Sequence, residues 1–286
     1  MRYVVITPVR DEESFVAATI AAVRAQTILP TQWVIVNDGS TDRTGSIIEA
    51  HAATTPWITV VHRANRGFRK SGAGVVEAFY EGYAALTCNN WDFVVKLDGD
   101  LSFSPDYFEK CFAHFCEQPR LGIGGGDIYH DLGGKLTLEA NPRFHVRGAT
   151  KIYRRDCWKA IGGLVTAPGW DTIDEVKANM LGWETMAFED IPLVHHRLTG
   201  SADGLLRDRV KHGAACYACG YHPLFVLASC LSRVAQKPYV IGSMAIFFGF
   251  LRGYVARSPR VSEVRLIRYL RRQQLRRLIG LDTVWR

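Results

Sequence analysis

Two aspartates separated by one glycine are the strongest chemical signal in the sequence. Asp98 and Asp100 flank Gly99 and follow FVVKL, a run typical of a buried strand. Carboxylates two residues apart at the end of a strand project to the same side. Their hard oxygen atoms suit Mg²⁺ or Mn²⁺ held together with substrate phosphate oxygens. The triplet therefore predicts a divalent metal site for a phosphate leaving group, the alternative being an ordinary Asp-Gly turn.

A second acidic loop follows an earlier strand-like run, with Asp38 inside VIVNDGSTD. A carboxylate in this position can accept a hydrogen bond from a nucleotide base or a ribose hydroxyl. Residues 40–42 of the same loop are equally suited to cap a helix. In an open parallel sheet, ligands bind at the carboxyl ends of the strands. Asp38 is therefore a candidate nucleotide contact at the edge that carries Asp98 and Asp100.

Strand-like and helical patterns alternate through the first hundred residues. Apolar runs at 3–6, 33–36, 58–61 and 93–97 predict strands, and the segments 11–26, 42–53 and 73–86 between them predict helices, the first with Asp11 as its N-cap. This alternation predicts an α/β fold of right-handed βαβ units, with a Rossmann-type, mostly parallel sheet flanked by helices. The second hundred is less regular, with helices expected at 105–116, 156–161 and 173–181 and strands at 121–125 and 185–188.

The last third of the chain changes character. Residues 223–234 and 239–251 are strongly apolar, but each run is shorter than the roughly 20 residues that span a bilayer. Residues 262–278 form an arginine-rich helical pattern, and the segment from Arg252 onward carries ten arginines against Glu263 and Asp282, within a total net charge of +7. We therefore expect a catalytic domain at 1–205 and a helical, membrane-associated region at 206–286 that meets anionic lipid. A solvated basic helix is the alternative.

Charge and cysteine usage restrict the partners and the compartment. Because the first 251 residues are close to neutral, no nucleic-acid partner is expected. The seven cysteines are scattered, and the only CxxC has no second pair to complete a zinc site. The chain also runs from Met1 directly into a strand-like segment without a signal peptide. These features predict a reducing cytoplasm, with the protein peripheral or interfacial at the inner face of the membrane.

The motifs ITPVRDEE, VNDGSTD and Asp98-Gly99-Asp100, in this order, resemble family 2 glycosyltransferases of the GT-A fold over roughly residues 3–200. The family usually carries an aspartate where Asn37 stands, so of that pair Asp38 is retained. The resemblance implies an inverting enzyme that binds a nucleotide sugar with Mg²⁺ or Mn²⁺. It implies nucleotide-sugar contacts from Pro8, Arg10, Glu12, Asp38, Asn65, Gly67, Lys70 and Asp98.

The general base is expected on the acceptor side. Members of the family carry Glu-Asp about eleven residues before a glycine–aromatic pair, and counting back from Gly182 gives Asp171. Trp170 replaces the usual glutamate. Asp171 is the predicted base and Asp174 the second candidate, although Asp171 would also serve as a helix N-cap. His195 is the candidate third metal ligand beside Asp98 and Asp100, the alternative being a structural histidine.

Several function classes lack their signatures. No GxGxxG follows the first strand, no P-loop is present, and Gln273 to Arg276 is followed by arginine rather than the tryptophan of processive synthases. We expect transfer of a single hexose, from UDP-sugar by family precedent, to a glycan or lipid-linked acceptor in exopolysaccharide or cell-envelope assembly. The alternatives are a sugar-1-phosphate nucleotidyltransferase and a catalytically silent membrane-associated assembly subunit. The nucleotidyltransferase should show a glycine-rich loop with arginine after the first strand, and TPVR at 7–10 is not one.

Overall fold

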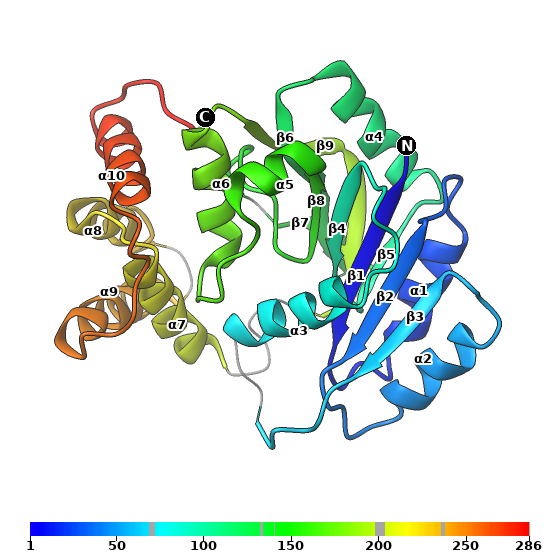
Figure 1. Cartoon of the computed structure of the whole chain (residues 1–286). Coiled ribbons are helices and arrows are strands. Elements are labelled where there is room, and N and C mark those ends of the chain that lie inside the picture. Colours follow the sequence, from blue (N-terminus) through cyan, green and yellow to red (C-terminus); the bar gives the residue numbers. More distant parts are fainter. Residues whose placement is uncertain (69–71, 132–133, 140, 198–203, 236–237, 286) are drawn as a thin grey trace.

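The computed structural model describes residues 1–68, 72–131, 134–139, 141–197, 204–235 and 238–285 (Figure 1). Lys70, a predicted nucleotide-sugar contact, lies outside these residues. The described chain forms one nine-stranded sheet covered by helices, which confirms the predicted α/β class. The strands are β1 (Tyr3–Val9), β2 (Gln32–Asn37), β3 (Ile58–His62), β4 (Phe93–Leu97), β5 (Leu101–Phe103), β6 (Leu121–Asp131), β7 (Leu136–Leu138), β8 (Thr150–Arg154) and β9 (Glu184–His195).

The sheet is mixed, so the prediction of a mostly parallel sheet was wrong. Its order is β3-β2-β1-β4-β8-β6-β9-β5, with β7 paired to β6. Strands β1 to β4 are parallel, as their βαβ pattern predicted, and β6 is parallel to β9. Strand β8 is antiparallel to both β4 and β6, and β5 and β7 also pair antiparallel. The short strands β5, β7 and β8 carry too little apolar pattern to be predicted, and they make the second half mixed.

Helices cover both faces of the sheet. They are α1 (Val16–Arg24), α2 (Thr44–Ala52), α3 (Ala73–Ala84), α4 (Tyr107–Glu117), α5 (Arg155–Ile161), α6 (Trp170–Met180), α7 (Leu205–Ala218), α8 (Pro223–Ser232), α9 (Tyr239–Val255) and α10 (Val264–Leu278). Because successive strand side chains point to opposite faces, Val5 packs with Ile20 of α1 on one face, and Val4 packs with Phe79 of α3 on the other. Burial on both faces explains the continuous apolar runs of the central strands.

Asp11 does not cap the first helix, contrary to the prediction. Helix α1 begins at Val16, and Asp11 adopts a left-handed backbone with φ of 53°. Its carboxylate accepts a hydrogen bond from the backbone N–H of Thr41 at 2.8 Å, and its own N–H donates to Ser40 Oγ at 3.0 Å. Asp11 therefore fastens the loop that follows β2 to the end of β1.

The C-terminal helices pack closely on one another and on α6, beside the sheet (Figure 1). Helix α7 was not predicted. It crosses α9 at glycines, since a Cβ on Gly213 would lie 1.9 Å from the carbonyl oxygen of Ile246. Leu266 and Leu270 of α10 share a hydrophobic cluster with Ile173 of α6. The predicted boundary at residue 205 thus coincides with the start of α7, but the two parts share a core. No helix in the described residues is long and apolar enough to cross a membrane.

Candidate functional site

The two acidic loops meet at the end of β1, between β2 and β4. The backbone N–H of Asp38 donates to the carbonyl of Val9 at 2.8 Å. On the opposite side of this residue, a Cβ on Gly99 would lie only 2.5 Å from Val9 Cγ1. Glycine is therefore required for the Asp98–Asp100 turn to approach β1. The structure brings Asp38, Asp98 and Asp100 to one edge of the sheet.

Asp38 is buried and held by arginines. Its carboxylate accepts hydrogen bonds from Arg63 at 2.5 Å and from both terminal nitrogens of Arg66 at 2.7 Å. This bidentate pair fixes the plane of the carboxylate. Neither arginine was assigned to Asp38 from the sequence, because arginine spacing does not show which acidic group a flexible side chain will meet. The side chain of Asn37 bonds within its own loop: its Oδ1 accepts a hydrogen bond from the backbone N–H of Ser40 at 3.0 Å.

Three predicted nucleotide-sugar contacts lie around Asp38. Arg10 donates to the backbone carbonyl of Asp38 at 3.2 Å and to Asn65 Oδ1 at 2.9 Å. The same Asn65 oxygen accepts from the N–H of Gly67 at 2.8 Å, and Gly67 has the left-handed φ of 77° that favours glycine. Pro8 is buried within β1 and pairs with Val36 of β2, two residues before Asp38. Hydrogen bonds through Arg10 and Asn65 thus connect the loop at Gly67 to the backbone of Asp38.

Asp98, Asp100 and His195 form a possible metal-binding group. One ligand atom from each of the three lies within 4.8 Å of the others. His195 Nε2 is 3.2 Å from Asp100 Oδ2, whereas the buried Nδ1 has no hydrogen-bond partner in the described chain. Two carboxylates and one imidazole are a donor set that Mn²⁺ or Mg²⁺ accepts. His195 ends β9, whose pairing with β5 brings it to the acidic turn.

The two aspartates of this group have opposite pKa shifts. Burial raises the pKa of Asp98 above its usual value, although Lys96 beside it acts in the opposite direction. Burial also acts to raise the pKa of Asp100, but the hydrogen bond and charge of His195 outweigh it and hold that pKa below its usual value. A divalent cation would offset the remaining cost of keeping both carboxylates ionised at this buried position.

Glu12 reaches this group through an arginine. Arg197 Nη2 lies 2.6 Å from Glu12 Oε2, and Arg197 Nε lies 3.9 Å from Asp100 Oδ2. The backbone N–H of Glu12 donates to Thr44 Oγ1 at 2.7 Å. Glu12, predicted as a nucleotide-sugar contact, therefore positions Arg197 next to the acidic turn. No local sequence pattern predicts this pairing, because the two residues are 185 positions apart.

His130 and Glu139 form a neighbouring group that sequence reasoning missed. His130 Nε2 is 3.0 Å from Glu139 Oε2, and together with His195 these side chains place ligand atoms within 4.8 Å of one another. Arg147 also contacts Glu139, at 2.7 Å. His130 lies on β6, which pairs with β9, so the contact depends on strand pairing between segments far apart in sequence.

Asp171 lies in the first turn of α6 and is partly exposed. A Cβ on Gly148 would lie 3.2 Å from Asp171 Oδ2, so the segment before β8 passes directly beside the carboxylate. Burial acts to raise the pKa of Asp171, but the charges of His145, Lys151 and Arg147 together hold that pKa below its usual value. The carboxylate is therefore ionised at neutral pH and available to accept a proton.

Asp174, the second candidate base, is buried and bound to other groups. Both carboxylate oxygens lie 3.0 Å from Lys151 Nζ, and the hydroxyl of Tyr153 donates to one of them at 2.6 Å. Burial raises the pKa of Asp174 to about 6, despite the charge of Lys151. Lys151 also lies 2.8 Å from Glu175. This buried network ties α6, which carries Asp171, to β8.

Trp170 stands where the family usually has glutamate. Its ring lies 5.6 Å from both Lys96 Nζ and Lys151 Nζ. The aromatic face thus partly stabilises two buried ammonium groups by cation–π interaction. Tryptophan in place of glutamate at position 170 removes a negative charge beside the two lysines. Both lysines remain paired, because each also contacts an aspartate.

A cavity of about 900 Å³ lies next to the segment that leads into α6. Its lining includes Ala73 at the start of α3, Pro168 just before α6, and Arg252 and Arg260 at and beyond the end of α9. The cavity is mainly apolar, with basic side chains at its lining. Ile173 of α6, two residues after Asp171, also lines the cavity, and a space of this size is large enough for part of an acceptor molecule.

Two curated proteins are similar to this chain in sequence. "Uncharacterized glycosyltransferase EpsJ" of Bacillus subtilis (strain 168) is 30% identical over 145 residues, covering 48% of this chain and 38% of that protein. "Putative glycosyltransferase EpsH" of the same organism is 26% identical over 217 residues, covering 68% of this chain and 60% of that protein. The matches span less than two thirds of either relative.

Solved structures share the fold. The mannosyltransferase PcManGT from Pyrobaculum calidifontis, in complex with GDP-Man and Mn²⁺, has a TM-score of 0.57 at 16% identity and covers 91% of this chain and 76% of that one. TarS 1–349 of S. aureus, in complex with UDP-GlcNAc, has a TM-score of 0.52 at 16% identity, with 89% and 73% covered. At these identities the likeness establishes the fold, which is that of GT-A glycosyltransferases.

A family model that matches more than half of the chain establishes the family. Residues 4–163, more than half of the chain, match the family model described as "Glycosyl transferase family 2". The matched range contains Asp38, Asp98 and Asp100, while Asp171 and His195 lie beyond it. The chain is therefore a member of glycosyl transferase family 2.

Proposed function

We propose that this protein is an inverting transferase that moves a single hexose from a nucleotide diphosphate sugar to a lipid-linked glycan acceptor. The observation that carries the proposal is the meeting of Asp38, Asp98 and Asp100 around Val9, at the carboxyl ends of parallel strands. Ligands bind at this edge in open α/β sheets. UDP is the donor nucleotide we favour, and the solved neighbours bind GDP-Man and UDP-GlcNAc.

The donor would lie along the edge from Asp38 to Asp100. Asp38, fixed by Arg63 and Arg66, would accept from the base or ribose, with Arg10 and Asn65 beside it. Asp98 and Asp100, with His195, would hold Mg²⁺ or Mn²⁺. The cation would neutralise the charge that develops on the nucleoside diphosphate as it leaves.

Asp171 would act as the general base. The acceptor hydroxyl oxygen attacks the anomeric carbon while the bond from that carbon to the diphosphate oxygen breaks on the opposite side, which inverts the configuration. The hydroxyl proton passes to the Asp171 carboxylate, whose lowered pKa keeps it ionised beforehand. Asp174 would serve to position α6, because its carboxylate is already bound by Lys151 and Tyr153.

The acceptor would be presented at a membrane surface, on the cytoplasmic side. Helices α8 and α9 expose large apolar side chains, each between 41% and 86% accessible: Leu224, Leu227, Leu231, Val240, Ile241, Met244, Phe248, Leu251 and Val255. Many exposed apolar side chains on two helices that pack on each other are typical of a docking or membrane-contacting face. The arginine-rich α10, with a positive charge facing solvent, is suited to anionic lipid.

The test is a panel of UDP-, GDP- and dTDP-sugars, with and without Mn²⁺, followed by thermal unfolding of the purified protein. Binding to the folded state raises the unfolding temperature, so the correct donor should stabilise the protein only in the presence of Mn²⁺. Release of nucleoside diphosphate should follow with the same donor. Asp100→Ala should remove the Mn²⁺-dependent stabilisation, whereas Asp156→Asn, an exposed aspartate on α5, should keep it.

Failure of every nucleotide sugar to stabilise the protein or to be consumed would favour the catalytically silent assembly subunit. Release of pyrophosphate from a nucleoside triphosphate and a sugar phosphate would instead support the nucleotidyltransferase. Either result would overturn the proposal.

A further inference from the structure

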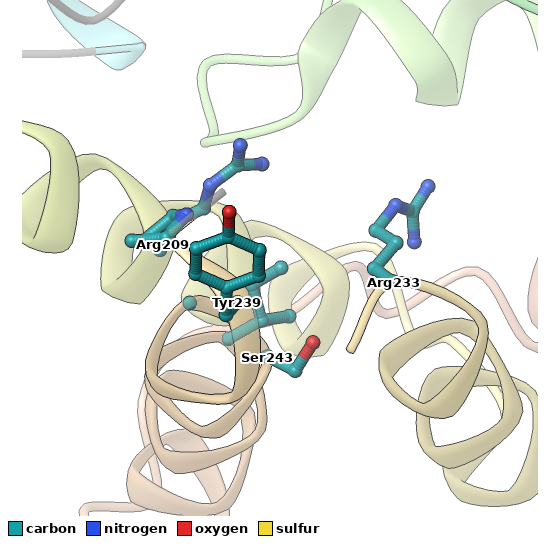
Figure 2. Close-up of a pocket in the computed structure, with 7 residues that line it drawn as sticks. Arg209, Arg233, Tyr239 and Ser243 are labelled. Carbon is teal, nitrogen blue, oxygen red and sulfur yellow. The ribbon is translucent and has the colours of Figure 1, made fainter. Parts of the chain in front are cut away.

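A small pocket lies among the C-terminal helices α7, α8 and α9. Figure 2 shows Arg209 of α7 and Arg233 at the end of α8 on two sides of it, with Tyr239 and Ser243 of α9 between them. The remaining lining is provided by Pro238, Gly242 and Ile246. None of these residues belongs to the donor site described above.

Two buried polar atoms in this pocket have no hydrogen-bond partner in the described chain. They are the hydroxyl oxygen of Ser243, whose residue is 8% exposed, and Nε of Arg209. A buried polar group without a partner is destabilising, because it has lost its hydrogen bonds to water and gained none. The arginine group is a donor, and the serine hydroxyl can donate as well. A ligand that offers several acceptor oxygens would satisfy both.

The pocket also carries uncompensated positive charge. Within the described residues, no carboxylate pairs with Arg209 or Arg233, and Arg233 donates only to the carbonyl of Ser229 at 3.3 Å. Arg209 and Arg233 both line the pocket, and two arginines that face one pocket create a site for an anion.

The surroundings of the pocket favour an anion on an apolar chain. Tyr239 is 55% exposed, and the adjoining Val240, Ile241 and Met244 of α9 are 51%, 61% and 65% exposed. A free phosphate ion would make no favourable contact with these apolar side chains. A lipid phosphate would place its chain against them and its head between the two arginines, as at other membrane interfaces.

Helix α7, which carries Arg209, also reaches the start of α6. A Cβ on Gly169, the residue before α6, would lie 3.6 Å from the carbonyl oxygen of Ala215 in α7. The helix that lines the pocket therefore packs against the segment that leads into Asp171.

We propose that Arg209, Arg233 and Ser243 bind the phosphate group of the lipid-linked acceptor, whose chain lies along the exposed face of α9. The inference rests on the proposed function and adds the acceptor site and the chemical class of its head group, a phosphate ester of a long apolar alcohol.

The experiment measures binding of the full chain to phosphatidylcholine vesicles that contain a polyprenyl phosphate. Matched vesicles contain phosphatidylglycerol at equal charge. The wild type should prefer the polyprenyl phosphate. Arg209→Ala and Arg233→Ala should each weaken that binding about tenfold or more, the value of one charge-assisted hydrogen bond. The matched control is Arg207→Ala, an exposed arginine on the same helix, which should bind as the wild type does.

Ser243→Ala keeps both charges and removes the buried hydroxyl, so it tests the pocket without risk to folding. We expect weaker binding of polyprenyl phosphate, by a few-fold, with unchanged binding to phosphatidylglycerol. Inorganic phosphate should compete poorly with the lipid. Three results would each overturn the lipid phosphate site. They are an equal loss of binding to both vesicle types, a loss in Arg207→Ala as large as in Arg209→Ala, and full competition by inorganic phosphate.

Donor binding separates this inference from the proposed function. All four variants should retain Mn²⁺-dependent stabilisation by the nucleotide sugar, because none of the four residues touches the sheet edge. If the wild type fails that donor assay but still discriminates between vesicles, the proposed function fails and the lipid site stands. If donor binding succeeds and vesicle discrimination does not, only the lipid site is wrong.

Discussion

The arginines at the edge of the sheet pair with a carboxylate, whereas two arginines of the C-terminal helices have no acidic partner among the described residues. At the sheet edge, Arg63 and Arg66 surround the buried Asp38 with hydrogen bonds of 2.5 to 2.7 Å. In the pocket of α7 to α9, Arg209 and Arg233 have no acidic partner in the described chain. The first region is preorganised by its own charges, so it needs only a small ligand and a cation. The second leaves charge and apolar surface unsatisfied, so it needs a partner from outside.

The largest expected effect that would sharpen this contrast is a loss of turnover after a change at Asp171, on the sheet side. Asp171→Asn should lower kcat by about 10²–10⁴, because the amide cannot take the acceptor proton. The affinity for the donor should not change, as Asp171 does not contact the Asp38 or Asp100 groups. Steady-state kinetics and calorimetry of donor binding measure the two quantities. Unchanged turnover would remove Asp171 from the mechanism, and Asp156→Asn is the control.

The second largest effect concerns the buried charges that support α6. Lys151→Met should lower the free energy of unfolding by about 3–5 kcal/mol, because Asp174 and Glu175 would remain buried without their cation. Unfolding in urea measures the loss. Lys110→Met, which breaks an exposed ion pair with Asp106, should lower the free energy of unfolding far less, because solvent screens that pair. Equal losses in the two variants would mean that the sheet side is no more preorganised than the surface.

A smaller effect tests the helical side. Met244→Glu places a charge in the middle of the exposed apolar face of α9 and should weaken binding to neutral vesicles about tenfold. Stability should be unchanged, since the side chain is 65% exposed. Leu29→Glu, at a similarly exposed leucine far from α9, is the matched control. Equal binding by both variants would show that this face does not contact lipid.

The smallest effect lies within the donor site. Asn37→Asp restores the aspartate usual in the family and keeps the oxygen that accepts from the N–H of Ser40. We expect donor affinity to increase by less than about tenfold, the net value of one hydrogen bond. Calorimetric titration with the preferred donor measures the change. An unchanged or weaker affinity would mean that position 37 does not contact the nucleotide.

Local patterns predicted the first half of the fold well. The apolar runs that became β1, β2 and β4 are buried on both faces, so their composition marks them as parallel strands. The strands β5, β7 and β8 were missed because none of them is a continuous apolar run, and their existence depends on partners from β4, β6 and β9. The prediction of a mostly parallel sheet failed for that reason. Asp11 was assigned to a cap because sequence cannot show that Thr41 competes for its carboxylate.

The sequence by itself determined the acidic motifs, their positions at strand ends and the membership of the family. Those features depend on residues close together in the chain, where spacing dictates direction. Only the tertiary structure decided which charges pair. Arg197 bridges Glu12 and Asp100, Lys151 binds Asp174 and Glu175, and Arg209 and Arg233 remain without an acidic partner in the described chain. Long side chains can reach many neighbours, so their partners follow from how distant segments pack.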